Sequence, residues 1–321
     1  MGDGLGTAVW TNTSALSVGG NGTGTLNINA GGLVSTLGLL GGNAASGVNF
    51  DAGTLRITTQ NTNNTSNAMT LLHGGGTIDI PSAAATFTVN SAMSGPGGLI
   101  KTGSGMMELA GANLYAGGTT VNSGTLLINN TSGSGTGSGP VSVAVGATLD
   151  GGGSITGDVT IDGSLSPGNS PGVFSQGALT FNEGSFFVYD VDSSSRTADL
   201  VNVDGELSIN QLTTLSLSDP MNAVLGMGTK FTIVNYLGTW NGGAFDGIPQ
   251  GSSFMLGVNK FQIFYDDISG GSNFGGGSFG AGSRYVTITV VPEPDLHLAI
   301  AVCGLLGTTA ARLRHGSRIR R

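Results

Sequence analysis

The 321-residue sequence predicts an all-β protein: a parallel β-helix, or solenoid, then a β-rich cap and a single C-terminal transmembrane helix. Glycine occupies 59 positions and charged residues only 9% of the chain, against roughly 7% and about 25% in ordinary domains, which disfavours helix. Short alternating runs such as TLNIN, TLRIT and TIDI are bounded by Gly, Asn or Ser, as is typical of short strands joined by turns. An apolar residue opens a strand about every 23 residues, whereas a propeller blade needs about 40.

Residues 1–210 are expected to form the β-helix, with regular coils from about residue 15. The apolar residues that open successive repeats are Leu26, Leu55, Ile78, Leu99, Leu126, Leu149, Leu165, Leu179 and Leu207. Stacked coils bury a narrow column of aliphatic side chains, with glycines at the corners. The residues that we expect to point inward include Leu26, Ile28, Leu55, Ile57, Ile78, Ile80, Leu126 and Ile128. The polar stretch at 130–139, NTSGSGTGSG, predicts a loop pushed out of one coil.

One stretch of this region resembles a known repeat. Residues 97–130, GGLIKTGSGMMELAGANLYAGGTTVNSGTLLINN, resemble the autotransporter-associated β-strand repeat in the glycine-rich opening, the Gly-Ala-Asn-x-Tyr centre and the Gly-Thr-Leu close. The segments GSLSPGNSPGVF (163–174) and ADLVNVDGELSI (198–209) resemble what commonly follows that repeat. The resemblance implies a right-handed β-helix. One departure is MME at 106–108, where the repeat usually has small polar and β-branched residues.

Residues 211–290 are expected to form the β-rich cap. The segments FTIVNYLG and YVTITVV keep the alternation of a strand but have lost the repeat. Because the ends of a solenoid need covering, we interpret this region as the cover of its C-terminal end.

Residues 291–321 differ from the rest of the chain. The motif Val291, Pro292, Glu293 and Pro294 precedes an apolar run, Leu296 to Ala311, and then a basic cluster made of Arg312, Arg314, Arg318, Arg320 and Arg321. Sixteen helical residues span about 24 Å against a hydrocarbon core of about 30 Å, a gap that local thinning and snorkelling arginines can close. Arginines after an apolar run hold the C-terminus on the cytoplasmic side.

This tail resembles the PEP-CTERM sorting signal. The resemblance implies that an exosortase, a membrane cysteine transpeptidase, is the partner that processes the chain near Pro292 to Pro294. The alternative is a C-terminal helix buried in a soluble protein, but nothing else in this β-rich chain would pack over it.

The charge distribution restricts the possible partners. The net charge is −8, but five basic residues lie in the last ten positions, so residues 1–291 carry a charge near −11. An acidic body of this kind argues against a nucleic-acid partner, because it cannot neutralise phosphates. The single cysteine, Cys303, allows neither a disulfide nor a cysteine-based metal site. The N-terminus has no secretion-signal pattern, so we expect the sequence to be a fragment or to have a misplaced start.

The carboxylates are the main candidates for chemistry. The densest group comprises Asp190, Asp192, Asp199, Asp204 and Glu206. Such a group could act as general acid and base on a glycosidic bond, and Asp190 and Asp192 are weak candidates for calcium ligands. We favour solvated strand and turn residues instead, since no tight calcium loop is present.

The remaining titratable residues give a weaker signal. Asp266 and Asp267 are expected at a turn, and a Ser-His-Asp triad would have to use His73, the only histidine outside the tail. We therefore expect no enzymatic activity and no cofactor.

The sequence predicts an exported structural or adhesive protein of the cell surface or extracellular matrix, with a transient C-terminal membrane anchor. The first alternative is a β-helix that binds or cleaves extracellular polysaccharide. A second is a passenger fragment of an autotransporter, which would need a C-terminal membrane β-barrel of alternating strands, and this tail lacks such strands.

Overall fold

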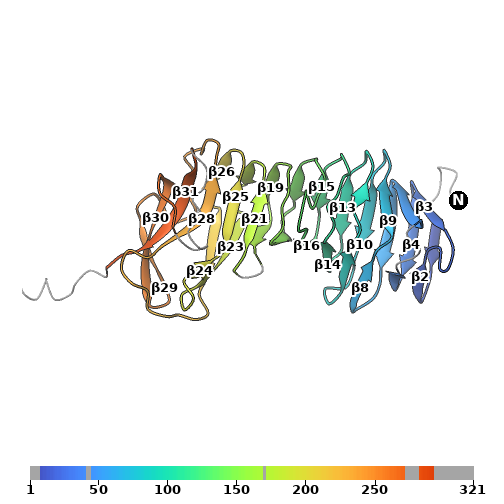
Figure 1. The fold of residues 1–321 in the computed structure, drawn as a ribbon, viewed down its shortest axis with the longest axis horizontal. Coiled ribbons are helices and arrows are strands. Elements are labelled where there is room, and N and C mark those ends of the chain that lie inside the picture. The colour runs from blue at the N-terminus through green and yellow to red at the C-terminus, as the bar shows by residue number, and fades with distance from the viewer. Residues whose placement is uncertain (1–7, 41–44, 169–170, 272–281, 293–321) are drawn as a thin grey trace, which may run out of the picture.

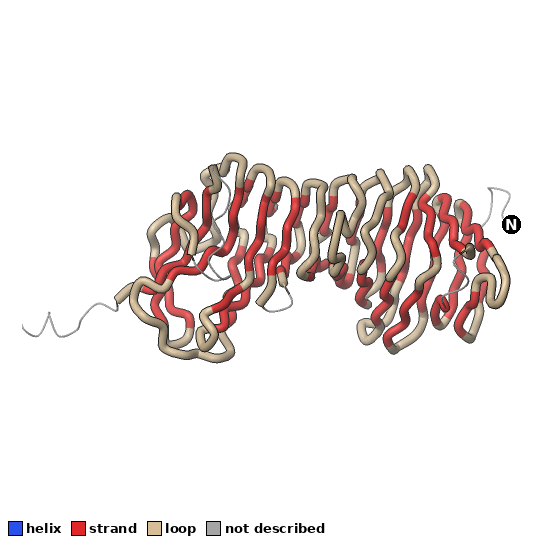
Figure 2. Tube along the Cα trace, in the orientation of Figure 1, coloured by secondary structure: helices blue, strands red, loops and turns tan. Residues whose placement is uncertain are grey.

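The computed structural model describes residues 8–40, 45–168, 171–271 and 282–292. Within these residues all the regular secondary structure is β-strand, and Figure 2 shows the strands joined only by loops and turns. The molecule is elongated, and most strands lie across its long axis (Figure 1). The all-β parallel solenoid expected from the sequence is confirmed; its handedness stays a prediction.

One face of the solenoid is a ten-stranded sheet in which every neighbouring pair is parallel. Its strands, in order, are β1 (Ala8–Thr11), β4 (Gly32–Thr36), β7 (Gly53–Ile57), β10 (Gly76–Asp79), β13 (Leu99–Thr102), β15 (Thr119–Val121), β17 (Val141–Val143), β19 (Val159–Ile161), β22 (Leu179–Phe181) and β26 (Leu207–Ile209). Paired residues are 18 to 28 positions apart in the sequence, as for Val141 opposite Val159 and Leu179 opposite Leu207. Each coil therefore has about the length that the repeat predicted.

The second face is a nine-stranded sheet that follows the first around each coil. It contains β8 (Thr62–Thr65), β11 (Thr86–Val89), β14 (Met106–Leu109), β16 (Gly124–Ile128), β18 (Ala147–Gly151), β20 (Ser164–Pro167), β23 (Phe186–Asp192), β24 (Thr197–Ala198) and β27 (Thr214–Ser218). In the first two coils this position is occupied by the two-stranded sheet β2 (Ala15–Ser17) and β5 (Gly38–Leu40).

The third face is interrupted. A four-stranded sheet covers the N-terminal part: β3 (Thr25–Asn29), β6 (Gly47–Asp51), β9 (Ala68–Leu71) and β12 (Met93–Ser94). A six-stranded sheet covers the C-terminal part: β21 (Val173–Gln176), β25 (Leu200–Val203), β28 (Lys230–Tyr236), β31 (Arg284–Val290), β30 (Asn259–Asp267) and β29 (Ser253–Leu256). Between β12 and β21 the chain crosses this face without strands.

The interior is the aliphatic column that the sequence predicted. Of the eight residues expected to point inward, seven are fully or almost fully buried, whereas Leu26 is only partly buried. Leu26 lies on β3, in the first described coil, so no described coil stacks on its outer side.

The stretch at 130–139 departs from expectation. Residues 131–133 are exposed, but Ser134 and Thr136 are buried, and residues 134–137 form part of the interrupted face. The Gly135 N–H donates to the carbonyl of Ser154 in the next coil at 2.7 Å. The predicted loop is therefore wrong for 134–137: residues this small fit in the coil wall, where their backbone polar groups find partners.

The cap begins later than expected. β27 still pairs in parallel with β23, and β28 with β25, so the coil continues beyond residue 210 to about Trp240, which bridges to Leu207. Among the described residues after 210, the strands that pair antiparallel are β29, β30 and β31, with β31 also pairing antiparallel with β28. The boundary at 210 was wrong because the sequence repeat disappears before the coil itself does.

An aromatic cluster closes the C-terminal end of the column. Measured between ring centroids, Phe245 lies 6.3 Å from Phe181, 5.9 Å from Phe187 and 5.8 Å from Tyr265. Trp240 stacks on Tyr265 at 5.6 Å. The last coil is thus covered by aromatic side chains from the cap.

No helix among the described residues has the length and apolar character that crossing a membrane requires. The expected transmembrane run, Leu296 to Ala311, lies outside the described residues.

Candidate functional site

The outer face of the ten-stranded sheet carries a row of hydroxyl side chains in register, which we name the hydroxyl column. Strand alternation turns the flanking apolar residues inward and leaves one outward position per short strand, where β-branched Thr is favoured. Its members are Thr54, Thr77, Thr120, Ser142, Thr160, Thr180 and Ser208, with Ile100 between Thr77 and Thr120. Neighbouring strands lie about 4.8 Å apart. No side chain or backbone group of the described residues pairs with these seven hydroxyls, so they can bond to an outside partner.

A second row beside it is bonded within itself. Asn182 donates to Asp162 at 2.8 Å, Asn210 to Asn182 at 3.4 Å, and Asn241 to Asn210 at 3.3 Å. Asp162, Asn182 and Asn210, together with Glu183 and Gln211, border a shallow depression of about 470 Å³. Amide side chains therefore stack from coil to coil in this row, and they fix the surface beside the hydroxyl column.

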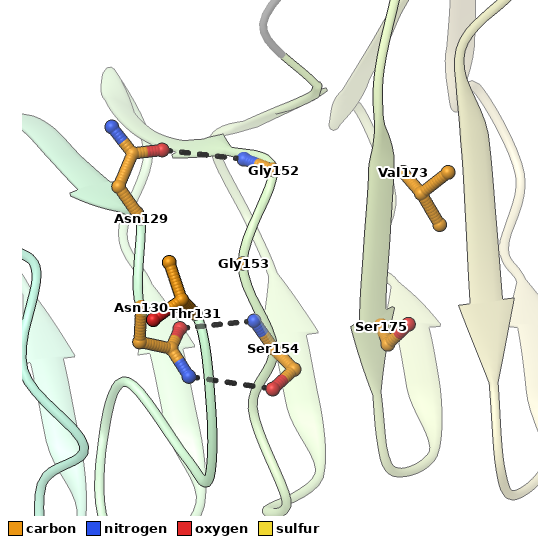
Figure 3. Close-up of a pocket in the computed structure, with 8 residues that line it drawn as sticks. All are labelled: Asn129, Asn130, Thr131, Gly152, Gly153, Ser154, Val173 and Ser175. Atoms are coloured by element: carbon orange, nitrogen blue, oxygen red, sulfur yellow. Dashed lines mark hydrogen bonds between the residues drawn. The ribbon is translucent and has the colours of Figure 1, made fainter.

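A polar groove of about 440 Å³ lies at the interruption of the third face (Figure 3). Its lining residues are Asn129, Asn130, Thr131, Gly152, Gly153, Ser154, Val173 and Ser175. The Asn130 side chain accepts from the Ser154 N–H at 3.0 Å and donates to the Ser154 hydroxyl at 3.4 Å, while Asn129 accepts from the Gly152 N–H at 3.5 Å.

The groove brings together amide and hydroxyl groups from three coils, a chemistry suited to sugar hydroxyls. The repeat pattern does not predict this groove, because its one sequence signal is Asn129 and Asn130, the pair of asparagines that ends the repeat.

The motif residues of the repeat point inward. Lys101 takes the place of an aliphatic residue, between Ile78 and Val121, and is 0% exposed. Its ammonium group donates to the carbonyls of Thr102, Gly103 and Ser123 at 2.8 to 3.1 Å. Burial lowers the pKa of Lys101 to about 8, although Asp79 acts in the opposite direction.

Asn113 and Tyr115 have similar roles. The Asn113 side chain accepts from the Met93 N–H at 2.6 Å and donates to the Gly135 carbonyl, so it links three coils across the interrupted face. Tyr115 is 0% exposed and bonds to the Thr119 hydroxyl at 2.6 Å. The motif residues Lys101, Asn113 and Tyr115 are thus buried and form hydrogen bonds inside the solenoid.

The carboxylates of the acidic group lie in different surroundings. Asp192 accepts from Ser194 and Ser195 in its own turn, and these hydrogen bonds lower its pKa to about 2. Asp199 is 2% exposed; burial raises its pKa to about 6 despite N–H donors from Asp190 and Gly172.

The calcium prediction gains no support from the arrangement. Within the part of the chain that the structure describes, no group of three His, Cys, Asp or Glu side chains is placed to hold a metal ion. Asp190 and Asp192 alone would supply few of the six to eight oxygen ligands that Ca²⁺ takes. Asp204 and Glu206 are exposed.

The other candidates are separate from these carboxylates. Asp266 and Asp267 lie at the end of strand β30 and not at the expected turn. Asp267 pairs with Lys230 of β28 at 2.7 Å, and Asp266 lies 3.7 Å from Arg284 of β31, so both belong to ion pairs between strands. His73 is exposed, on a turn at one end of β10.

Only the first part of the sorting motif can be placed. The Val291 N–H donates to the carbonyl of Lys260 at 2.9 Å, and Pro292 is exposed. Glu293, Pro294 and the five terminal arginines lie outside the described residues.

Comparison with known proteins agrees with the internal arrangement. Residues 99–128 match the passenger-associated-transport-repeat family, which confirms the repeat expected at 97–130. The chain is also 36% identical over 175 residues to "Adhesin BmaC autotransporter" of Brucella suis biovar 1. That alignment covers 49% of this chain and 5% of the relative, so the chain spans about a twentieth of the relative's length.

Proposed function

We propose that this chain is an exported, non-enzymatic structural or adhesive component of the cell surface, held out as a stiff β-solenoid. The observation that carries the proposal is the hydroxyl column, because an outside partner can bond to seven aligned hydroxyls that have no partner among the described residues. The similarity to part of a protein named an adhesin supports the same conclusion. The buried positions of the repeat motif explain why this region can resemble other passengers without sharing a catalytic site.

We propose further that an exosortase-type transpeptidase sorts the chain through its tail. The support is the order Pro292-Glu293-Pro294, apolar run, arginine cluster. The chain should be expressed with a secretion signal in a host that has the matching exosortase. Mass spectrometry should then find an exported product that lacks the segment from about Leu296 onward. A released product that still ends in Arg321 would contradict the sorting role.

Two tail variants separate the parts of this signal. Replacing the five arginines with serine should weaken retention and processing, because the positive flank opposes translocation. Glu293→Ala should impair cleavage but leave membrane insertion intact, since acidic residues contribute little to orientation.

Polysaccharide binding is a second candidate, favoured by the hydroxyl column and the groove of Figure 3. Replacing Thr120, Thr160 and Thr180 with valine keeps the shape and strand propensity but removes three hydroxyls. Retention on bacterial or algal polysaccharides should fall. The matched control replaces Thr125, Thr148 and Thr214, on the nine-stranded sheet, with valine. If both triple variants are retained equally on the polysaccharides, the hydroxyl column is not the binding surface.

Cleavage is tested separately. If the chain degrades any of these polysaccharides and Asp190→Asn or Asp192→Asn abolishes the turnover, the enzymatic alternative replaces the structural one.

A further inference from the structure

We propose that an apolar patch on the cap rests on the lipid surface while the C-terminal tail is inserted in the membrane. The patch consists of Met221, Val224, Met227, Met255 and Val258, whose exposed fractions are 58%, 84%, 73%, 53% and 48%. Clustered exposed apolar side chains of this kind mark interaction sites, whereas single ones are ordinary. The inference rests on the membrane-anchored tail of the proposed function.

The patch is one surface because hydrogen bonds hold its two segments together. The Asn222 side chain accepts from the Val258 N–H at 2.8 Å. Asn259 accepts from the Leu225 N–H and donates to the Ala223 carbonyl, both at 2.8 Å. Leu225 is buried between its exposed neighbours and anchors the loop. The loop 221–228 and the hairpin tip 255–259 therefore present their apolar side chains together.

The chain leaves the described structure at this patch. The Val290 carbonyl accepts from the Gly228 N–H at 2.9 Å, and the Val291 N–H donates to the Lys260 carbonyl at 2.9 Å. Strand β31 thus ends between the two segments of the patch. The apolar run begins four residues after Pro292, and four extended residues reach at most about 14 Å. A tail inserted in the membrane would hold the patch within that distance of the bilayer.

One basic residue, Lys260, lies beside the patch. Lys260 lies opposite Met255 in the hairpin and makes no salt bridge among the described residues. A lysine beside apolar side chains can reach anionic headgroups while its stem lies on the apolar surface. Methionine side chains adapt readily to irregular apolar surroundings. A bilayer containing anionic lipid is therefore the partner to which we assign the patch.

The test places one probe in the patch of the full-length chain. In a Cys303→Ser background, Val224→Cys receives an environment-sensitive fluorophore, and the protein is reconstituted into phosphatidylcholine and phosphatidylglycerol vesicles. We expect a blue shift and a several-fold loss of quenching by aqueous iodide. The matched control is Val145→Cys, at an equally exposed valine (81%) on the turn between β17 and β18, whose label should remain quenchable.

A label on the native Cys303 reports separately on tail insertion. If that label enters the lipid but the label at position 224 stays aqueous, the inference is overturned while the anchored tail stands. If the Cys303 label also stays aqueous, the anchored tail fails and the inference falls with it. If iodide quenches the label at position 224 as weakly without vesicles as with them, protein covers the patch. That result likewise overturns the assignment to lipid.

Discussion

Single residues inside the coil decide more of its stability than the outer rows do. Lys101 is the clearest case, because its ammonium group satisfies carbonyls at a corner between two coils. In Lys101→Met the stem is kept but the carbonyls of Gly103 and Ser123 lose this donor, so we expect a loss of about 1–3 kcal/mol in the free energy of unfolding. Lys260→Met is the control and should change stability by less than about 0.5 kcal/mol. Urea unfolding measures both; equal effects would contradict the supporting role.

Asp199 should make the protein more stable in mild acid. Its folded-state pKa of about 6 lies above the ordinary value of 3.8, so between these values the folded chain binds more protons than the unfolded chain. Stability should therefore rise as the pH falls from about 6 to about 4, by up to about 3 kcal/mol. Below pH 4 stability should fall again as the pH falls, because of Asp267. Burial alone would raise the pKa of Asp267, but hydrogen bonds from Lys230, Ser269 and Thr287 hold it at about 2. Protonation of Asp267 removes the stabilisation that these hydrogen bonds give to the folded chain.

Urea unfolding at pH 4, 5, 6 and 7 checks this pH dependence. The rise between pH 6 and 4 should shrink in Asp199→Asn, where the titrating group is gone. A variant with the same slope as the parent would assign the effect to other carboxylates.

At this scale the sequence predicted burial well and partners poorly. Alternation alone identifies Ile57 and Ile80 as inward, because every second residue of a strand faces the same side. It could not place Lys101 among aliphatic neighbours, since its carbonyl partners come from turns whose register only the folded coil defines.

At the level of turns, glycines allow the coils to stack closely. Gly103 has a φ of +77°, and a Cβ there would collide with the carbonyl of Ile80 in the preceding coil. Gly228 has a similar φ of +81° but open space around it. Gly228→Ala should cost about 1–2 kcal/mol from backbone strain alone, whereas Gly103→Ala should cost clearly more, because the neighbouring coil must also move. Chemical unfolding of both variants measures the difference, and similar costs would show that the coils yield easily.

Turn and wall segments were also where prediction failed. The sequence 134–137 reads as a linker because Gly and Ser lack any strand pattern, yet the same small size lets it lie in the coil wall. The groove of Figure 3 lies where the third face has no strands, between neighbouring coils, so periodicity does not predict it.

For the whole molecule, the aromatic cluster around Phe245 determines whether the last coil of the solenoid is shielded from solvent and from other chains. Phe245 is 2% exposed and contacts rings of both the last coils and the cap. Phe245→Ala should lower the free energy of unfolding by about 3–5 kcal/mol and promote association, because the open end of a β-helix can pair with other chains. Phe254→Ala, at a partly exposed position, is the control. Thermal unfolding and size-exclusion chromatography check the two effects, and an unassociated Phe245→Ala variant would show that the cap covers the end without this ring.

The stacking of parallel strands also sets how the protein responds to force. Each coil contacts mainly its neighbours, so a pull on the N-terminal end of a chain held at its C-terminus would peel off one coil at a time. A released coil of 18 to 28 residues adds about 6–10 nm of slack. A single-molecule pulling trace should therefore be a sawtooth. A cell tethered through this molecule would stay attached while the tether lengthens in steps.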